Sequence, residues 1–273
     1  MKKIGFIDFY LSEWHANNYP AWIREAGRGF EVAYAWAEQE VSPVDGKTSA
    51  EWCAEMGVTL CATAEEVCAK SDVILVLAPS DPQVHLRLAE RVLPFGKPTY
   101  MDKTFAPDLV TAEKIFALAE EYNTPLFSTS ALRYAAEAEE GQAVLVTGGG
   151  RSAEEYIVHQ AELLEVILGQ GATSVTATEA AGGMLFAVDY ANGKKGAMLF
   201  GEKLPFSLMI TDGEGKQTYR AVKSAFFPAL MEEILTFFES GIPPVTKNAT
   251  LQVMALRQAA LKAAQTPGIS VKV

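Results

Sequence analysis

The interpretation of the first half of this chain begins with Asp72-Val73-Ile74-Leu75-Val76-Leu77. Five apolar residues in succession after one acid are typical of a strand buried on both faces of a parallel sheet. Similar runs alternate with helical patterns over the first 128 residues. The expected strands are residues 3–8, 30–36, 58–60, 72–77, 99–101 and 125–128. The expected helices are residues 17–26, 49–56, 64–69, 82–93 and 108–122. This alternation predicts βαβ units and a doubly wound parallel sheet.

The second half of the chain has a different pattern. A helix expected over residues 153–168 follows Gly148-Gly149-Gly150. Four strands are then expected in succession, with a fifth candidate, at residues 174–179, 184–190, 195–201, 204–211 and 217–221. Asn192-Gly193 and Asp212-Gly213 are hairpin-turn signals, and helices are expected at 228–239 and 249–265. The sequence therefore predicts an α/β domain over residues 1–128 and an α+β domain over 129–273, built on a mostly antiparallel open sheet.

Composition narrows the class of partner. Hydrophobic residues make up 49% of the chain, enough for packed cores, and the formal net charge is −11. Such a charge argues against nucleic acid and anionic membrane surfaces as partners, and favours a small molecule. No apolar run reaches the roughly 18–20 residues that a membrane-spanning helix needs. The apolar run at the start of the chain is too short for a signal-peptide core, so we expect a cytoplasmic protein. We expect its three cysteines to be buried or unreactive thiols rather than disulfides or metal ligands. The three histidines lack metal-site spacing.

The loop after the first strand lacks the expected phosphate-binding glycines. Ligands of doubly wound sheets bind beyond the carboxyl ends of the strands, and a dinucleotide would call for G-x-G-x-x-G here. The residues are Asp8-Phe9-Tyr10-Leu11-Ser12-Glu13-Trp14-His15. Two interpretations stay open: a cofactor binds through Ser12 and the following helix N-terminus, or the dinucleotide site is altered or lost. For His15 we expect a capping role. The candidate cofactor contacts in this loop are Asp8, Phe9, Tyr10 and Ser12.

The end of the second strand is the expected place for an adenosine ribose. Trp36 stands there, with Glu38 and Glu40 just beyond. No arginine is nearby in the sequence to take a 2′-phosphate, so NAD is mildly favoured over NADP. A solvated acidic turn is the alternative interpretation.

One segment suggests a family. Gly96-Lys97-Pro98-Thr99-Tyr100-Met101-Asp102-Lys103-Thr104-Phe105-Ala106 resembles the G-K-x-x-x-x-E-K-P-x-A segment of the Gfo/Idh/MocA oxidoreductases, the glucose–fructose oxidoreductase and inositol dehydrogenase group. Leu77-Ala78-Pro79-Ser80, followed by His85, is similar to the family's A-T-P segment and its downstream histidine. Leu132-Arg133-Tyr134 is similar to its Arg-aromatic pair, and Gly148-Gly149-Gly150 with His159 is similar to its G-G-G…D-x-x-x-H signature. Residues 226–264 are similar to its closing helices. The chain thus resembles a divergent member over nearly its whole length.

The resemblance implies a Rossmann-like domain that holds NAD or NADP, and a sheet domain that covers a sugar, polyol or related hydroxy compound. It implies that Lys103 contacts cofactor and substrate and that His159 exchanges the substrate proton. Further cofactor contacts are implied at Ala78, Pro79, Ser80 and Asp102. Asp102 stands where the family has glutamate, and Thr104 stands where it has proline. His85 is expected to start a helix.

The chemistry of these residues suits oxidation of an alcohol. A histidine with a pKa of about 6.5 can exchange the hydroxyl proton, and a lysine can stabilise a developing alkoxide. Either Glu154 or Glu155 replaces the family's aspartate. Glu155 lies four residues before His159 and shares its helix face, so we expect it to orient the imidazole. Lys103 and His159 are expected to face one shared cleft.

Two hypotheses follow for the whole chain. The first is an NAD(P)-dependent oxidoreductase. The second is a non-catalytic, ligand-binding member of the same family with a lost or altered dinucleotide site, which the glycine-free loop favours. In both cases the strands over residues 184–211 leave one sheet face exposed, which suggests a homodimer or homotetramer.

Overall fold

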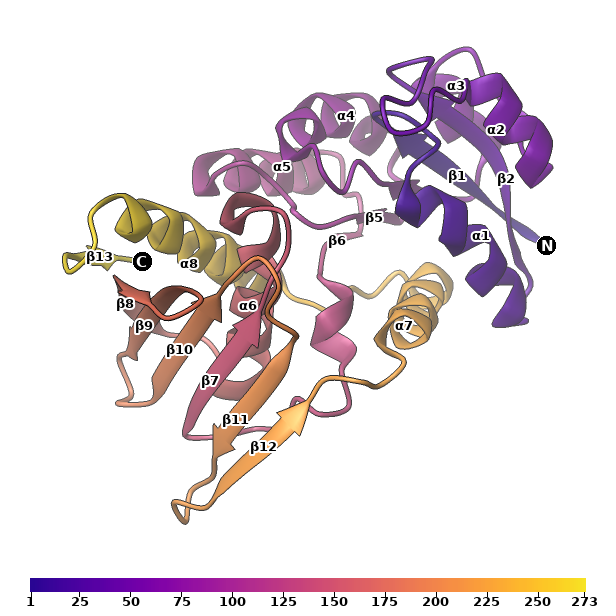
Figure 1. Ribbon diagram of the computed structural model, residues 1–273. Coiled ribbons are helices and arrows are strands. Elements are labelled where there is room, and N and C mark those ends of the chain that lie inside the picture. Colours follow the sequence, from indigo (N-terminus) through magenta and orange to yellow (C-terminus); the bar gives the residue numbers. More distant parts are fainter. The chain divides into compact units, whose positions relative to one another are not determined.

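The computed structural model describes residues 1–273 and divides them into two compact units. The first unit comprises Met1–Thr129 and Pro228–Lys247, and the second comprises Ser130–Phe227 and Asn248–Val273. Figure 1 shows the elements of both units along the chain.

The first unit is built on a six-stranded sheet in which every neighbouring pair is parallel. Its strands are β1 (Lys2–Asp8), β2 (Phe30–Ala37), β3 (Thr59–Leu60), β4 (Val73–Val76), β5 (Thr99–Met101) and β6 (Leu126–Phe127). Their order is β3-β2-β1-β4-β5-β6. The order reverses between β1 and β4, and this confirms the doubly wound, Rossmann-like sheet. All four residues of β4 are buried, as its apolar run predicts.

Local capping signals set the helix boundaries of this unit. The helices are α1 (Trp14–Glu25), α2 (Ser49–Met56), α3 (Ala64–Lys70), α4 (His85–Val92) and α5 (Leu109–Glu121). Thr63 caps α3 by accepting a hydrogen bond from the backbone N–H of Glu66, as such a spacing predicts. Helix α1 begins three residues before the expected Asn17, because the carboxylate of Glu13 caps it at Trp14.

Helix α7 (Phe226–Ser240) packs on the first unit although it follows the second sheet in sequence. The Phe237 ring lies 4.8 Å from that of Phe127, centroid to centroid, and Arg28 forms ion pairs with Glu232 and Glu239. The sequence pattern predicted that every residue after 128 belongs to the second domain. The structure differs for residues 228–247, because contacts between distant segments decide to which unit a helix belongs.

The second unit is built on a seven-stranded sheet. Its strands are β7 (Ala143–Gly148), β8 (Ala172–Ala180), β9 (Gly183–Tyr190), β10 (Lys195–Phe200), β11 (Ser207–Thr211), β12 (Gln217–Ala221) and β13 (Ser270–Lys272), in the order β12-β11-β7-β10-β9-β8-β13. Only the pair β7–β10 is parallel, which confirms a mostly antiparallel sheet. Strands β7 and β13 were not expected from the sequence.

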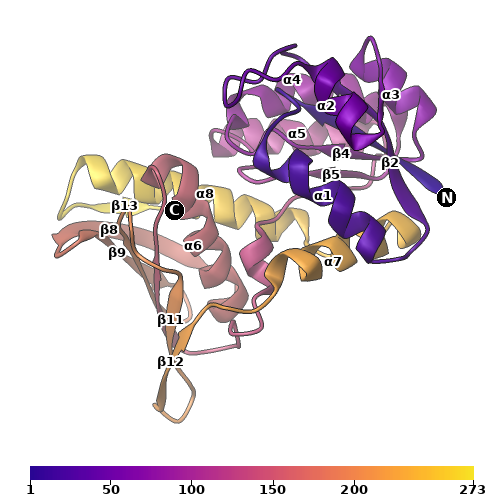
Figure 2. The ribbon, with the colours of Figure 1, turned by 45° about the vertical axis from the view of Figure 1, so that its right-hand side comes forward.

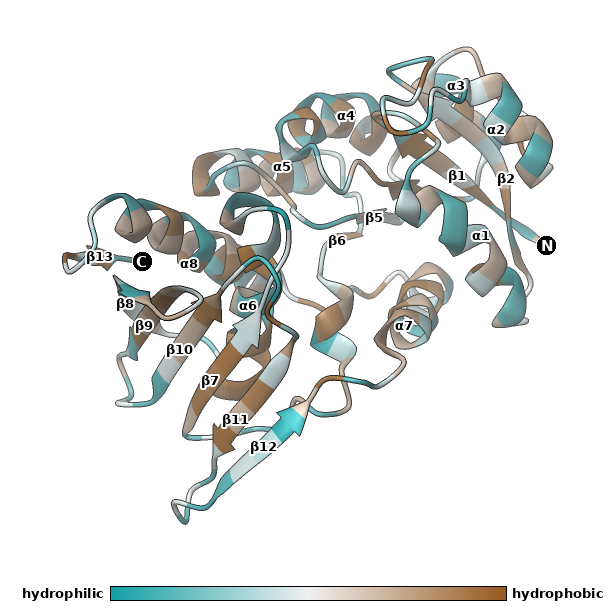
Figure 3. Ribbon diagram, viewed as in Figure 1, coloured by the Kyte–Doolittle hydropathy of each residue, from teal (hydrophilic) through white to brown (hydrophobic).

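Two helices cover one face of this sheet. Helices α6 (Ala153–Leu168) and α8 (Lys247–Gln265) lie on the same side in both ribbon views (Figures 1 and 2), and their buried residues share one core with the inward residues of the strands. Strands β7 and β10 are largely apolar along their length (Figure 3). None of the helices combines the length with the apolar character needed to cross a bilayer.

The glycine run after β7 is a packing requirement. A Cβ built on Gly149 would lie 2.9 Å from both Glu202 O and Leu204 N, and closer still to the carbonyl oxygen of Gly201. These are backbone atoms, so they cannot rotate away as a side chain would. We expect Gly149→Ala to lower the free energy of unfolding by about 1–3 kcal/mol, measured by urea titration. Gly213→Ala is the control. Its Cβ would meet open space, so an equal loss there would contradict the steric explanation.

Candidate active site

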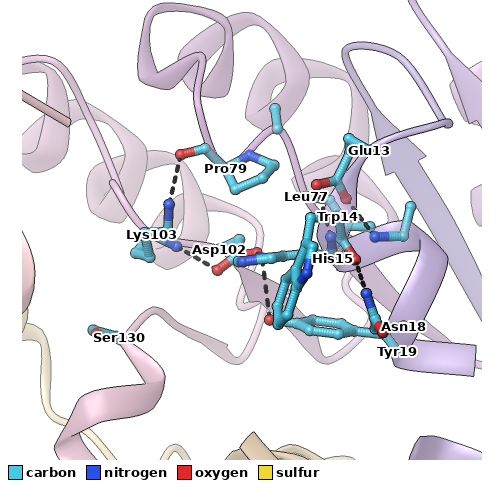
Figure 4. Close-up of polar contacts among 12 residues, drawn as sticks. Glu13, Trp14, His15, Asn18, Tyr19, Leu77, Pro79, Asp102, Lys103 and Ser130 are labelled. Atoms are coloured by element: carbon cyan, nitrogen blue, oxygen red, sulfur yellow. Dashed lines mark hydrogen bonds and ion pairs between the residues drawn. The ribbon is translucent and has the colours of Figure 1, made fainter. Parts of the chain in front are cut away.

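Lys103 lies at the carboxyl edge of the first sheet, directly after β5. Its side chain is buried, with a relative exposure of 8% for the residue. The ammonium donates a hydrogen bond to the carbonyl oxygen of Pro79 at 3.0 Å (Figure 4). The peptide bond between Lys103 and Thr104 is cis. A buried cation therefore stands where ligands of doubly wound sheets bind.

Asp102 connects Lys103 to the start of α1. Its Oδ1 accepts hydrogen bonds from the backbone N–H of Lys103 at 2.7 Å and from the Tyr100 hydroxyl at 3.1 Å. Its Oδ2 pairs with Nδ1 of His15. Burial by itself would raise the pKa of Asp102, but the charge and hydrogen bond of His15 outweigh burial and lower the pKa. Asp102 is thus a buried carboxylate rather than a neutral acid.

His15 occupies the second position of α1, where the sequence analysis expected a capping role. The cap is Glu13 instead, and the imidazole of His15 points to Asp102 (Figure 4). The ring stacks on Tyr19 with centroids 5.1 Å apart, and it meets Trp14 edge-on at 5.2 Å. No local pattern predicted this pairing, since the two partners are 87 positions apart.

The glycine-free loop is filled by its own carboxylates. Glu13 accepts hydrogen bonds from the backbone N–H of His15, at 2.8 Å, and of Ala16. Asp8 accepts one from Phe9 N at 2.7 Å and one from Ala78 N at 2.9 Å. Burial raises the pKa of both carboxyl groups, and in Asp8 the charge of Glu13 adds to this effect.

The other residues expected in this loop are also engaged within the protein. The hydroxyl of Ser12 donates to the carboxylate of Asp45 at 2.8 Å. Phe9 and Tyr10 pack against each other, with centroids 5.9 Å apart. Ser12 is therefore tied to Asp45.

These contacts decide how a dinucleotide fits. Its pyrophosphate would need free N–H groups at the start of α1 and a close approach of the backbone. The N–H groups of His15 and Ala16 are already bonded to Glu13, and Asp8 is buried in the same loop. A pyrophosphate would therefore have to displace Glu13 in order to bind against α1.

The turn after β2 contains arginines that the sequence analysis did not expect. Arg87 forms two hydrogen bonds of 2.7 Å with Glu38, and the Arg91 guanidinium lies 4.3 Å from the ring centroid of Trp36. Both arginines come from α4, about fifty positions further along the chain. No arginine is near this turn in the sequence, but the fold brings two to it, so the preference for NAD over NADP loses its basis.

The loop after β4 is held by Asp8 and His85. Ala78 has a φ of +58°, which is uncommon for a residue other than glycine, and its N–H donates to Asp8. His85 starts α4, as expected, and its ring lies between two carbonyl oxygens, 2.7 Å from Leu77 O and 3.0 Å from Phe105 O. Burial lowers the pKa of His85. The imidazole thereby joins the end of β4 to the loop that carries Lys103.

His159 belongs to the second unit, on α6, and is half-buried. Its Nδ1 lies 2.6 Å from the hydroxyl oxygen of Ser130, a partner that the sequence analysis did not single out. The Phe206 ring meets the imidazole edge-on, with centroids 5.9 Å apart. Glu155, expected to orient this ring, forms an ion pair of 2.6 Å with Arg151.

The three cysteines of the chain are not paired in disulfides. Cys53, Cys61 and Cys68 are free, buried thiols. Burial raises the pKa of Cys53 to about 11 and that of Cys68 to about 12, so these thiols stay protonated near neutral pH. No group of three or more histidine, cysteine, aspartate or glutamate side chains is arranged to hold a metal ion.

Comparisons with known proteins identify the fold. No protein-family model matches the chain, and no curated protein matches it in sequence. Among solved structures, the myo-inositol dehydrogenase from Lactobacillus casei in complex with NAD(H) and myo-inositol has a TM-score of 0.79 and 12% identity, over 100% of this chain and 96% of its own. The WlbA dehydrogenase from Bordetella pertussis, in complex with NADH and UDP-GlcNAcA, has a TM-score of 0.74 and 15% identity, over 100% and 98%.

A third similar structure is the UDP-N-acetylglucosamine 3-dehydrogenase GnnA from Acidithiobacillus ferrooxidans. Its TM-score is 0.75 and its identity 14%, over 96% of this chain and 97% of its own. The chain therefore has the two-part fold of these dehydrogenases over nearly its full length.

Proposed function

We propose that this chain is an oxidoreductase that acts on a hydroxyl group of a sugar, polyol or related small molecule, with NAD or NADP as its cofactor. The observation that carries the proposal is the buried ammonium of Lys103 at the carboxyl edge of the parallel sheet. Buried ionisable groups at such an edge are typical of catalytic sites. The similar structures bound to NAD(H) or NADH give it further support.

Several residues of this chain have different roles at the substrate hydroxyl. Lys103 donates to the substrate oxygen and stabilises negative charge that develops on it. His159 exchanges the hydroxyl proton, and Ser130 orients its ring through Nδ1. Glu155, one helical turn before His159, supports positive charge on the imidazole while Arg151 holds it. This assignment requires Lys103 and His159 to face the same substrate.

A second candidate is a ligand-binding protein of the same fold that uses no dinucleotide. Glu13 favours this candidate, because its carboxylate occupies the N–H groups to which a pyrophosphate would bind. Lys103 would then serve as a hydrogen-bond donor to the ligand.

Titration with NADH and with NADPH separates the two candidates. Binding is followed by quenching of tryptophan fluorescence, since Trp14 and Trp36 lie in the segments concerned. We expect a micromolar dissociation constant for at least one dinucleotide. The absence of binding at millimolar concentrations of both would contradict the oxidoreductase and support the second candidate.

We further propose that the chain forms a homodimer or homotetramer through the open face of its second sheet. Aligned register positions place one row of side chains across this face, from Tyr219 through Met209, Leu145 and Ala197 to Ala187. Met209 is 42% exposed. Apolar side chains in such a row are typical of subunit interfaces.

The substitution Met209→Glu should therefore lower the solution mass, measured by light scattering, toward that of a monomer. Val110→Glu is the matched control, since Val110 is an exposed apolar residue of the other unit. A wild-type mass equal to one chain would refute the oligomer.

A further inference from the structure

We infer that Glu13 is a built-in substitute for a diphosphate: its carboxylate occupies the N-terminus of α1 and weakens the binding of dinucleotides at that position. The inference rests on the proposed function in one respect, namely that the carboxyl edge of the first sheet is the ligand site.

Glu13 accepts the hydrogen bonds at the start of α1. A helix N-terminus presents unpaired N–H groups and a partial positive charge, and it therefore attracts anions. Here the two oxygens of Glu13 accept from the N–H groups of His15 and Ala16. The chain itself thus meets the helix's requirement for an anion.

The buried position of Glu13 opposes its displacement. An exposed capping side chain could swing into solvent when a ligand arrives, but Glu13 is only 6% exposed. A diphosphate would have to displace a buried carboxylate and take over its hydrogen bonds. Such a displacement gains little, because one anion replaces another at the same donors.

Other carboxyl groups surround the position of Glu13. Asp8 and Asp102 are both almost completely buried, and burial, together with the charges of Glu13 and Asp102, raises the pKa of Asp8. The Oδ2 atom of Asp8 is buried without a hydrogen-bond partner. An incoming diphosphate would add negative charge beside these carboxyl groups. Of the nearby basic side chains, Lys103 donates to Pro79 O and His15 is paired with Asp102.

An ordinary stabilising cap is the competing explanation for Glu13. Serine is one of the best N-cap residues, yet it has neither the charge nor the length of glutamate. Glu13→Ser therefore keeps a cap on α1 while it opens the space and removes the carboxylate. Glu13→Gln keeps the size and removes only the charge.

The experiment measures NADH affinity by tryptophan fluorescence in four proteins: the wild type, Glu13→Ser, Glu13→Gln and Glu25→Gln. Glu25 lies at the opposite end of the same helix and is exposed, so it is the matched control. We expect Glu13→Ser to bind NADH about tenfold more tightly than the wild type, or more. Glu13→Gln should gain less, and Glu25→Gln should match the wild type.

The outcomes distinguish this inference from the proposed function. A wild type that binds NADH at micromolar concentration, with the same affinity in Glu13→Ser, refutes the inference and leaves the proposed function standing. A wild type without binding and a Glu13→Ser variant with binding support the inference and refute dinucleotide use by the native protein. If neither protein binds NADH, both fail. Should Glu13→Ser not fold, as judged by its thermal unfolding, the comparison of Glu13→Gln with the wild type decides the question in the same way.

Discussion

Replacement of Lys103 by methionine should reduce kcat by about 10²–10⁴-fold, the contribution typical of a group that handles charge or protons in the transition state. Methionine keeps the apolar stem and removes the ammonium. The first unit should therefore stay folded, while the substrate oxygen loses its donor. The effect would appear in steady-state turnover with NAD⁺ or NADP⁺ and a panel of sugars and polyols. Dinucleotide affinity should change little.

Lys97→Met provides the contrast within the same segment. Its ammonium donates to the carbonyl oxygens of Cys68 and Ser71, which ties α3 to the approach to β5. This substitution should lower thermal stability and leave the kcat of the folded protein unchanged. Undiminished turnover in the Lys103 variant would remove the catalytic assignment. A loss of stability without a loss of kcat would make Lys103 a structural residue like Lys97.

The largest effect on stability is expected for Arg133→Met. The Arg133 guanidinium forms ion pairs with Glu162 at 2.6 Å and with Glu165 at 2.5 Å, and all three side chains are at most 15% exposed. Burial by itself would lower the pKa of Arg133, but the two carboxylates raise it, so the cation is firmly held. Its removal leaves two buried carboxylates without their partner. We expect a loss of about 3–5 kcal/mol in the free energy of unfolding, measured by urea titration.

Arg151→Met is the control for this prediction. Arg151 also pairs with a glutamate, Glu155, but its side chain is 71% exposed. Water screens such a pair, so its loss should cost no more than about 1 kcal/mol. A similarly small loss for Arg133→Met would show that the buried cluster contributes nothing beyond an ordinary surface pair.

Much of the secondary structure follows from local patterns. The expected bounds of α2, β5 and α6 agree with Ser49–Met56, Thr99–Met101 and Ala153–Leu168 in the structure. Each is defined by signals within a few residues, such as the capping box of Thr48 and Glu51 or the left-handed Gly57 after α2. Such signals depend only on neighbours in the chain, so a sequence reveals them.

The second sheet shows where local reasoning stops. Strand β7 was overlooked, although it alternates buried Val144 and Val146 with half-buried Ala143 and Leu145. It is an interior strand of the sheet, paired in parallel with β10 and antiparallel with β11. Nothing in these six residues indicates their partners. Their pairing depends on a helix and several strands that come later in the chain.

Local patterns along the chain predicted the parallel sheet, the mostly antiparallel second sheet and the position of Lys103 at a strand end. Contacts between segments far apart in the sequence bring His15 to Asp102 and Arg87 to the end of β2, and no local pattern predicted either of them. Strand and helix patterns are set by side chains adjacent in the chain. Contacts across the edge of a sheet arise from the strand order, which burial of the whole sheet fixes and which no local stretch encodes.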